Sequence, residues 1–201
     1  MSLLLVVPVA GQRPRLDVRA AVLTSSTLVE DLLATPALKT RLGSGLGSGP
    51  RAHAALGPEL SAGVLLPLRP GISLSGLLGW QLTKLQAEDD SGTREVQDLS
   101  VLHGLLAVDY SLRGPLVVSA GFGMLGYRSE AEGLFASGAD LAPLVRIGAG
   151  GSWPVAGQSL TVRAIADVHR FGTPLLRSAG GAGGGVLRYG LQVGIVPGGA
   201  R

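Results

Sequence analysis

Eight segments of this sequence alternate apolar residues with small or polar residues, and this pattern constrains the fold more than any other feature. A period of two predicts β-strands, because successive side chains of a strand point to opposite faces. In one segment, one face carries Leu78, Trp80 and Leu82, and the other carries Gly79 and Gln81. The eight segments span residues 16–23, 59–68, 72–83, 101–112, 116–127, 141–153, 160–169 and 187–195. The sequence therefore predicts an all-β fold of eight strands.

The connections between these segments alternate strictly between long and short. The long ones are 24–57, 84–98, 128–140 and 172–185, and the short ones are 69–71, 113–115 and 154–159. Transmembrane β-barrels have short turns at the periplasmic mouth and longer loops at the extracellular mouth. The pattern predicts an antiparallel up-and-down barrel with long extracellular loops. With an even number of strands, both ends of the barrel domain lie on the short-turn side.

Composition bears on which face of the strands points inward. Hydrophobic residues make up 46% of the 201 residues and charged residues 15%, which excludes disorder for most of the chain. No run of 18 apolar residues occurs, so membrane-spanning helices are excluded. The less apolar face mixes Gly, Ser and Leu with Arg and Asp, which suits a narrow lumen better than a solvated exterior. We therefore expect the apolar face to contact lipid, with Tyr110 and Trp153 at the membrane interface beside short turns.

Charge and cysteine content narrow the function further. A net charge of +3 is too weak to argue for a nucleic-acid partner, and we expect none. The chain has no Cys and only three scattered His, so no disulfide framework, metal site or cofactor is expected.

The N-terminus carries a short apolar stretch, residues 1–10, that ends in Val9-Ala10. This stretch is typical of the end of a secretory signal peptide, and an apolar first strand or a disordered tail is the alternative. The expected organisation is thus a signal-peptide remnant over 1–10 and a single barrel domain over 11–201, secreted through the inner membrane.

From residue 16 to residue 195 the chain resembles the small eight-stranded outer-membrane barrels typified by the OmpA transmembrane domain and its OmpX-like relatives. The resemblance implies a monomer in the outer membrane of a Gram-negative cell, in contact with the lipid bilayer. It also implies a structural or surface-interaction role without catalysis. The chain departs from the family at its end, where the last strand reads Val-Gly-Ile-Val over 193–196 and lacks the usual terminal Phe or Tyr.

The first long connection, 24–57, is the one part with helical signals. Thr27 and Glu30 fit a capping box, and Thr35-Pro36 fits an N-cap followed by a proline at N1. These signals predict short helices over 28–34 and 36–42. Their leucines either pack on the strand ends or contact a surface or periplasmic partner protein.

Nine charged or titratable residues fall on the predicted inward face. If the hairpin over 154–159 is symmetric, Arg146 lies opposite Asp167, where a bidentate ion pair can form. Because an unpaired charge is costly in a narrow lumen, we expect a structural network that plugs the barrel. A gated polar path or a small-ligand site is the alternative. The residues of this predicted network are Asp17, Arg19, Glu59, Asp109, Arg146, Arg163, Asp167, His169 and Arg188.

No catalytic residues are predicted. His103, Asp109 and Ser119 all face the lumen, but His103 and Asp109 lie six residues apart on one strand, about 20 Å at about 3.3 Å per residue. His169 lies closer to Asp167, and we assign it to the ion network. The sequence also lacks the His-x-Ser arrangement of lipid A deacylases.

Two other classes of protein stay open at this stage. A soluble or periplasmic lipocalin-like barrel that binds an apolar ligand requires the apolar face to point inward. A lipid-modifying outer-membrane enzyme requires an activated Ser or His near the membrane interface.

Overall fold

The structure is a computed structural model of the chain and describes residues 13–30, 49–128, 141–172 and 184–197. Every regular element in these ranges is a strand, and no helix there is long and apolar enough to cross a membrane. The predicted signal-peptide remnant, 1–10, lies outside the described residues. The strands are β1 (Arg15–Ser25), β2 (Thr27–Val29), β3 (Arg51–Ala54), β4 (Gly57–Arg69), β5 (Ile72–Asp89), β6 (Gly92–Ser111), β7 (Leu116–Arg128), β8 (Ala142–Val155), β9 (Gln158–Arg170) and β10 (Gly185–Val196).

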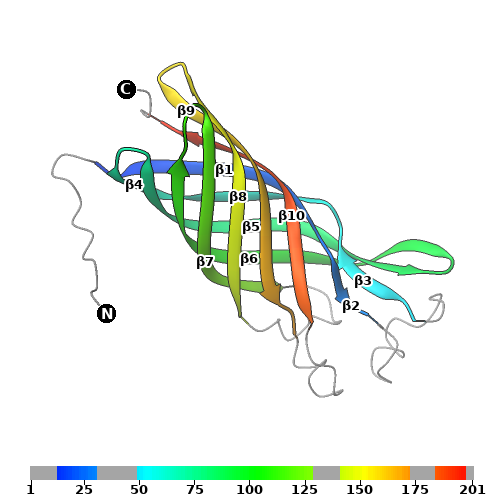
Figure 1. Ribbon diagram of the computed structural model, residues 1–201. Helices are drawn as coiled ribbons and strands as arrows, with labels where there is room; N and C mark the ends of the chain where they lie inside the picture. Colours follow the sequence, from blue (N-terminus) through cyan, green and yellow to red (C-terminus); the bar gives the residue numbers. More distant parts are fainter. Residues whose placement is uncertain (1–12, 31–48, 129–140, 173–183, 198–201) are drawn as a thin grey trace.

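Eight of these strands close into a ring in which every neighbouring pair is antiparallel (Figure 1). The order runs β5, β4, β1, β10, β9, β8, β7, β6, and the pairing of β5 with β6 closes the barrel. Closure leaves no edge in the body of the barrel, so each ring strand has a partner on both sides. The predicted up-and-down barrel of eight strands is confirmed.

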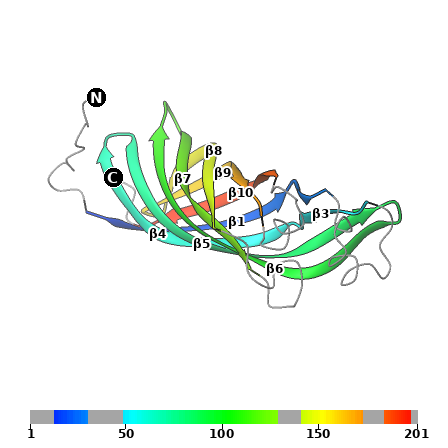
Figure 2. The same cartoon turned by 90° about the horizontal axis from the view of Figure 1, so that it is seen from below.

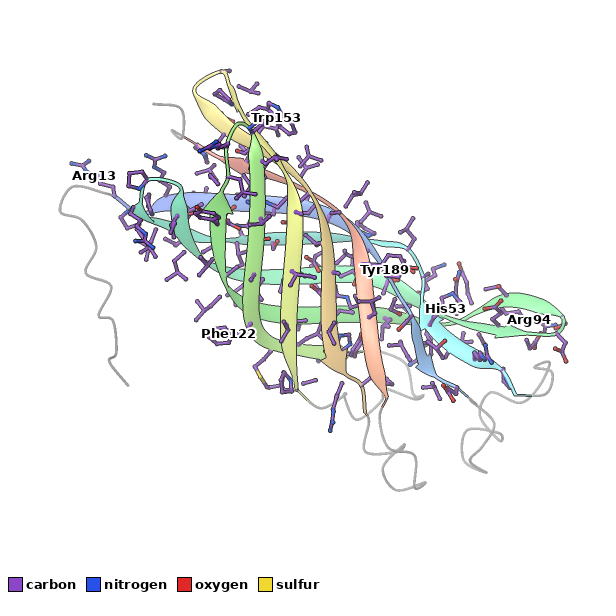
Figure 3. The ribbon with its side chains drawn as sticks, in the orientation of Figure 1. Arg13, His53, Arg94, Phe122, Trp153 and Tyr189 are labelled. Carbon is purple, nitrogen blue, oxygen red and sulfur yellow. The ribbon has the colours of Figure 1, made fainter. Side chains whose placement is uncertain are left out.

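The two faces of the strands point as the alternation predicts. Phe122 is 67% exposed on the outside, whereas Asp167 is 0% exposed inside the lumen. Figure 3 shows the side chains of Phe122, Trp153 and Tyr189 projecting away from the ribbon. A lipocalin-like barrel requires the opposite orientation of these faces. The apolar residues of the segments therefore form the outer surface of the barrel.

The short connections are tight turns at one end of the barrel. Between β8 and β9 the turn consists of Ala156 and Gly157, whose φ angles of 49° and 77° suit a two-residue hairpin turn. The start of β1 and the end of β10 lie at this same end (Figure 1). We call it the short-turn end.

The connection over 84–98, predicted to be a long loop, is instead the outer part of the β5–β6 hairpin. The two strands stay paired from Ile72–Tyr110 out to Asp89–Gly92, so the hairpin projects beyond the barrel (Figure 2). The polar residues here suggested a loop, but they occupy the faces of a two-stranded ribbon. The prediction was wrong because charged side chains are compatible with a two-stranded ribbon that projects beyond the barrel.

The predicted helix over 28–34 is wrong at its start. Thr27–Val29 form strand β2, which pairs with β3, and β3 pairs with β5. Leu28 and Val29 are buried against this sheet, and tertiary packing there overrides the local capping signal. The rest of that helix and the one predicted over 36–42 lie outside the described residues.

Candidate functional site

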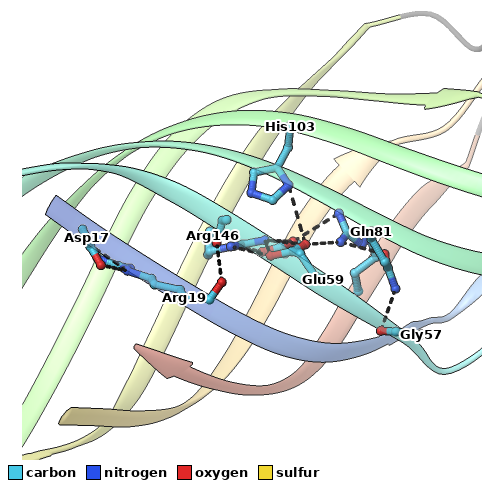
Figure 4. A network of polar contacts seen from close by, with 10 residues as sticks. Asp17, Arg19, Gly57, Glu59, Gln81, His103 and Arg146 are labelled. Atoms are coloured by element: carbon cyan, nitrogen blue, oxygen red, sulfur yellow. Dashed lines mark hydrogen bonds and ion pairs between the residues drawn. The ribbon is translucent and has the colours of Figure 1, made fainter. Parts of the chain in front are cut away.

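Glu59 is the centre of a buried polar cluster in the middle of the lumen (Figure 4). Arg146 donates to Glu59 Oε1 through Nη1 and Nη2, each at 3.3 Å, and Arg188 Nη2 donates to Oε2 at 2.8 Å. The ring of His103 lies beside the same carboxylate, with Nδ1 at 3.6 Å from Oε2. The four residues come from β4, β8, β10 and β6, so this cluster ties together strands on different sides of the barrel.

Asp167 completes the central cluster. Arg146 donates to it in a bidentate geometry, at 2.6 Å from Nε to Oδ1 and 2.8 Å from Nη2 to Oδ2. Arg146 and Asp167 are direct cross-strand partners, in the register that the symmetric hairpin predicts. Arg188 Nη2 also donates to Gln81 Oε1 at 2.9 Å, and Gln81 Nε2 donates to the Leu23 carbonyl at 3.0 Å.

A second cluster lies nearer the short-turn end. Arg19 donates to Asp17 at 2.6 Å, to Asp109 at 3.0 Å and to the Ser75 hydroxyl at 3.0 Å. Arg163 Nη1 donates to the other oxygen of Asp109 at 2.6 Å. All four charged residues are at most 7% exposed.

The two clusters together contain four arginines and four carboxylates, so their formal charges cancel. Each charged group in them has at least one partner of opposite charge. Desolvation of a charge is tolerated only when such partners replace the lost water. The network is therefore electrically neutral and connects strands across the lumen.

His169, predicted to belong to the ion network, has its hydrogen-bond partner outside the two clusters. Its Nε2 lies 2.7 Å from the Tyr127 hydroxyl, and Tyr127 meets Phe171 edge-on at 5.1 Å between ring centroids. These residues belong to an apolar layer at the mouth opposite the short-turn end. The layer includes Leu85, Leu99, Val101, Leu125, Leu144, Phe171 and Val186, each at most 2% exposed.

The sequence contained a signal for this apolar layer. Inward positions near the short-turn end carry Ser, Asp and Arg, whereas inward positions at the opposite end carry Val101, Leu125, Tyr127 and Leu144. A change from polar to large apolar residues along the inward face indicates that one mouth of the lumen is filled by packing.

Three further residues of the network were not predicted as its members: Ser75, Gln81 and His103. Their inward orientation follows from the alternation, but their contacts follow from strand pairing across the ring. Gly79 explains the position of His103, because a Cβ at Gly79 would lie 2.1 Å from the imidazole Cε1. A side chain at position 79 would therefore occupy the space of this ring, and glycine leaves it free.

His103, Asp109 and Ser119, the three residues considered above for catalysis, are not brought together into one site. His103 belongs to the central cluster, whereas Asp109 belongs to the cluster near the short-turn end. Ser119 lies opposite Asp109 in the sheet, on β7. Among the described residues there is no group of three or more His, Asp or Glu side chains that is able to hold a metal ion.

An open groove of about 1370 Å³ runs over the outer face of β5, where the hairpin leaves the barrel. Its barrel side carries Trp80 and Leu82, and its outer side carries Lys84, Glu95 and Arg128. A hydrogen bond from Lys84 to Glu95 raises the pKa of the Lys84 ammonium group, and both side chains are about half exposed. The groove thus combines the apolar outer surface of the barrel with a polar rim.

Comparison with known proteins supports the fold. No family model and no curated protein matches the sequence. Among solved structures, the crystal structure of neisserial surface protein A (NspA) superposes with a TM-score of 0.54 at 12% identity, and the match covers 93% of this chain and 98% of that one. The likeness, at this identity, shows that the chain has the fold of an eight-stranded β-barrel.

Proposed function

We propose that this protein is an outer-membrane β-barrel with a structural or surface-interaction role and without catalytic activity. The observation that carries the proposal is the outer surface of the ring. Large apolar side chains cover it on every ring strand, including Leu78 at 75% exposed, Leu191 at 63% and Ile147 at 58%. A soluble monomer rarely exposes a continuous apolar surface of this extent, whereas a bilayer requires one.

The geometry explains how such a barrel persists in lipid. Closure of the ring pairs the backbone donors and acceptors of every strand, which the hydrocarbon core demands. The central ion pairs join β4, β8, β9 and β10 through the lumen, and the apolar layer fills the far mouth. The lumen is therefore a second core that makes the barrel rigid.

Location and partners belong to the same proposal. The fold match to NspA, an outer-membrane barrel, supports insertion in the outer membrane. Secretion through the inner membrane is a further part of the proposal. The short-turn end then faces the periplasm, and the β5–β6 hairpin projects from the cell surface. We place the contact with a surface partner protein on this side, at the connection 24–57 and the neighbouring hairpin, and we expect a monomer.

Cell fractionation tests the proposal directly. The chain is expressed with its native upstream region, and the envelope is extracted with detergent. Boiled and unheated samples are then compared by gel electrophoresis. Recovery in the outer membrane with a band that shifts on heating supports the proposal, because closed barrels resist unfolding in cold detergent. A protein recovered in the soluble fraction would overturn it.

A further inference from the structure

Four arginines gather at the short-turn end of the barrel, on one side of the ring. Strand β1, whose first residue is Arg15, runs antiparallel to β4, whose last residue is Arg69. The Ser111 amide on β6 donates to the Gly71 carbonyl at 2.7 Å, which places the β4–β5 turn beside the β6–β7 turn that carries Arg113. We call these residues and their neighbour on β1 the basic rim: Arg13, Arg15, Arg69 and Arg113.

No described carboxylate is exposed at this end of the barrel. Asp17 and Asp109, which lie closest to the basic rim in their strands, are at most 5% exposed. They already accept hydrogen bonds from Arg19 and Arg163 in the lumen. The described carboxylates that are exposed or partly exposed lie at the opposite end: Glu30, Glu88, Asp89, Asp90, Glu95 and Asp98. The outer charge of the barrel is thus separated, with a purely positive patch at the short-turn end.

The side chains of the basic rim are available to a ligand outside the barrel. Arg13, Arg69 and Arg113 are exposed and Arg15 is partly exposed, and none of the four forms an ion pair with a described residue. Figure 3 shows Arg13 at this end, projecting from the start of β1. A guanidinium group presents a planar fork of N–H donors that matches two oxygens of a phosphate group. The rim therefore suits a ligand that carries phosphate.

The basic rim directly adjoins the apolar outer surface of the ring. Leu16 follows Arg15, and Leu112 precedes Arg113; both leucines are exposed, as is Tyr110 on the outward face of β6. If these side chains contact hydrocarbon, the arginines beside them reach the level of the lipid headgroups. The other side of this end differs, because residues 153–158 of the β8–β9 hairpin include no charged residue.

We propose that the basic rim binds the phosphate groups of anionic phospholipids in the leaflet at the short-turn end. The guanidinium groups donate to phosphate oxygens, and the acyl chains lie along the apolar strands beside them. A protein with an acidic surface is the competing occupant. Lipid is favoured because the rim borders the surface that a bilayer covers. The inference rests on the membrane location proposed above.

Quenching of tryptophan fluorescence by brominated lipids compares the two sides of the ring. The chain has two tryptophans, Trp80 and Trp153. Trp80→Phe leaves Trp153, on the uncharged side, as the control reporter. A second variant adds Trp153→Phe and Tyr110→Trp, so that the reporter lies beside the basic rim. Each full-length variant is refolded into phosphatidylcholine vesicles that contain either brominated phosphatidylglycerol or brominated phosphatidylcholine.

The two reporters should differ in their lipid preference. At position 110 we expect phosphatidylglycerol to be enriched about fivefold over phosphatidylcholine, the effect of one arginine at a membrane surface. Trp153 should show no preference. Equal quenching by the two lipids at position 110 overturns the inference, as does the same preference at both reporters. If brominated lipid quenches neither reporter, the barrel does not lie in lipid, and the outer-membrane proposal fails as well.

Charge variants assign the effect to the rim. Arg69→Gln combined with Arg113→Gln should lower the enrichment at position 110 to the level at Trp153. Lysine at both positions should keep part of it, because the charge remains and the planar fork is lost. Arg128→Gln removes the same charge at the opposite end and should leave the enrichment unchanged. Full enrichment in the folded double glutamine variant, or an equal loss in Arg128→Gln, would refute the site.

Discussion

At the residue scale, two buried carboxylates of the ion network, those of Glu59 and Asp109, each accept hydrogen bonds from two arginines. Glu59 accepts hydrogen bonds from Arg146 and Arg188 and lies beside His103, all of them buried. Removal of one partner from a buried ion pair leaves an uncompensated charge, which costs more than the intact pair contributes. The surface pair Lys84–Glu95 has the same chemistry in water, where screening removes most of its effect.

Substitution of Glu59 and of Glu95 tests whether the buried network contributes more to stability than the surface ion pair. We expect Glu59→Gln to lower the free energy of unfolding by about 3–5 kcal/mol, because two buried guanidinium groups then face a neutral amide. Urea titration of the barrel in vesicles measures it. Glu95→Gln is the matched control and should leave the unfolding free energy unchanged. The double variant Glu59→Gln, Arg188→Met restores the charge balance and should regain part of the loss. Equal effects of the two single variants would contradict a stabilising network.

At the element scale, inward-facing glycines let neighbouring strands approach closely. A Cβ added at Gly123 on β7 would lie 1.9 Å from the Gly104 carbonyl oxygen on β6. A Cβ added at Gly104 points outward and would lie 3.5 Å from Leu78 Cδ2, an ordinary contact. A side chain at position 123 would therefore clash with the neighbouring strand, whereas one at position 104 would not. Both glycines lie in the β6–β7 strand pair.

The same substitution at these two positions should have opposite outcomes. We expect Gly123→Ala to lower the free energy of unfolding by about 1–3 kcal/mol or more, because β6 and β7 must move apart. Gly104→Ala should be tolerated. The fraction of folded barrel on an unheated gel and a urea titration measure both. A Gly123→Ala variant as stable as the parent would show that the pairing of β6 with β7 adjusts freely.

At the scale of the whole molecule, the barrel has an apolar exterior and a filled interior. Phe122 lies at the middle of β7 and pairs with Leu106 and Val145, whereas Trp153 lies two residues from the end of β8. Both side chains point outward (Figure 3). The cost of a charge on the outside of a membrane barrel depends on its depth in the bilayer.

This depth dependence tests whether lipid surrounds the barrel. In vesicles we expect Phe122→Arg to lower the free energy of unfolding by about 2–4 kcal/mol, and Trp153→Arg by about 0–1 kcal/mol, because a guanidinium group introduced at the end of β8 reaches the interface. Circular dichroism during urea titration follows both variants. If Phe122→Arg unfolds at the same urea concentration as the parent, the outer face of the ring does not lie in hydrocarbon.

The filled interior predicts that the barrel does not conduct ions. In planar bilayers we expect no steady single-channel current from the parent. Glu59→Gln should also be silent, because the apolar layer around Leu85, Leu99 and Phe171 still closes the far mouth. A current from Glu59→Gln alone would show that the ion network, and not the apolar layer, closes the lumen. A current from the parent would favour the gated polar path.

The sequence by itself determined the ring and the direction of its side chains. Alternation with a period of two separates the two faces of each strand, and the composition of those faces indicates which one points inward. The symmetric turn at Ala156-Gly157 pairs Arg146 with Asp167, because the register of a hairpin is a local property of its turn. Tertiary structure alone decided which distant inward residues meet. Glu59 and Arg188 are 129 positions apart, and strand tilt and closure bring them together. The same long-range pairing placed His169 beside Tyr127. The β5–β6 hairpin also stays paired over residues 84–98, where the polar composition predicted a loop.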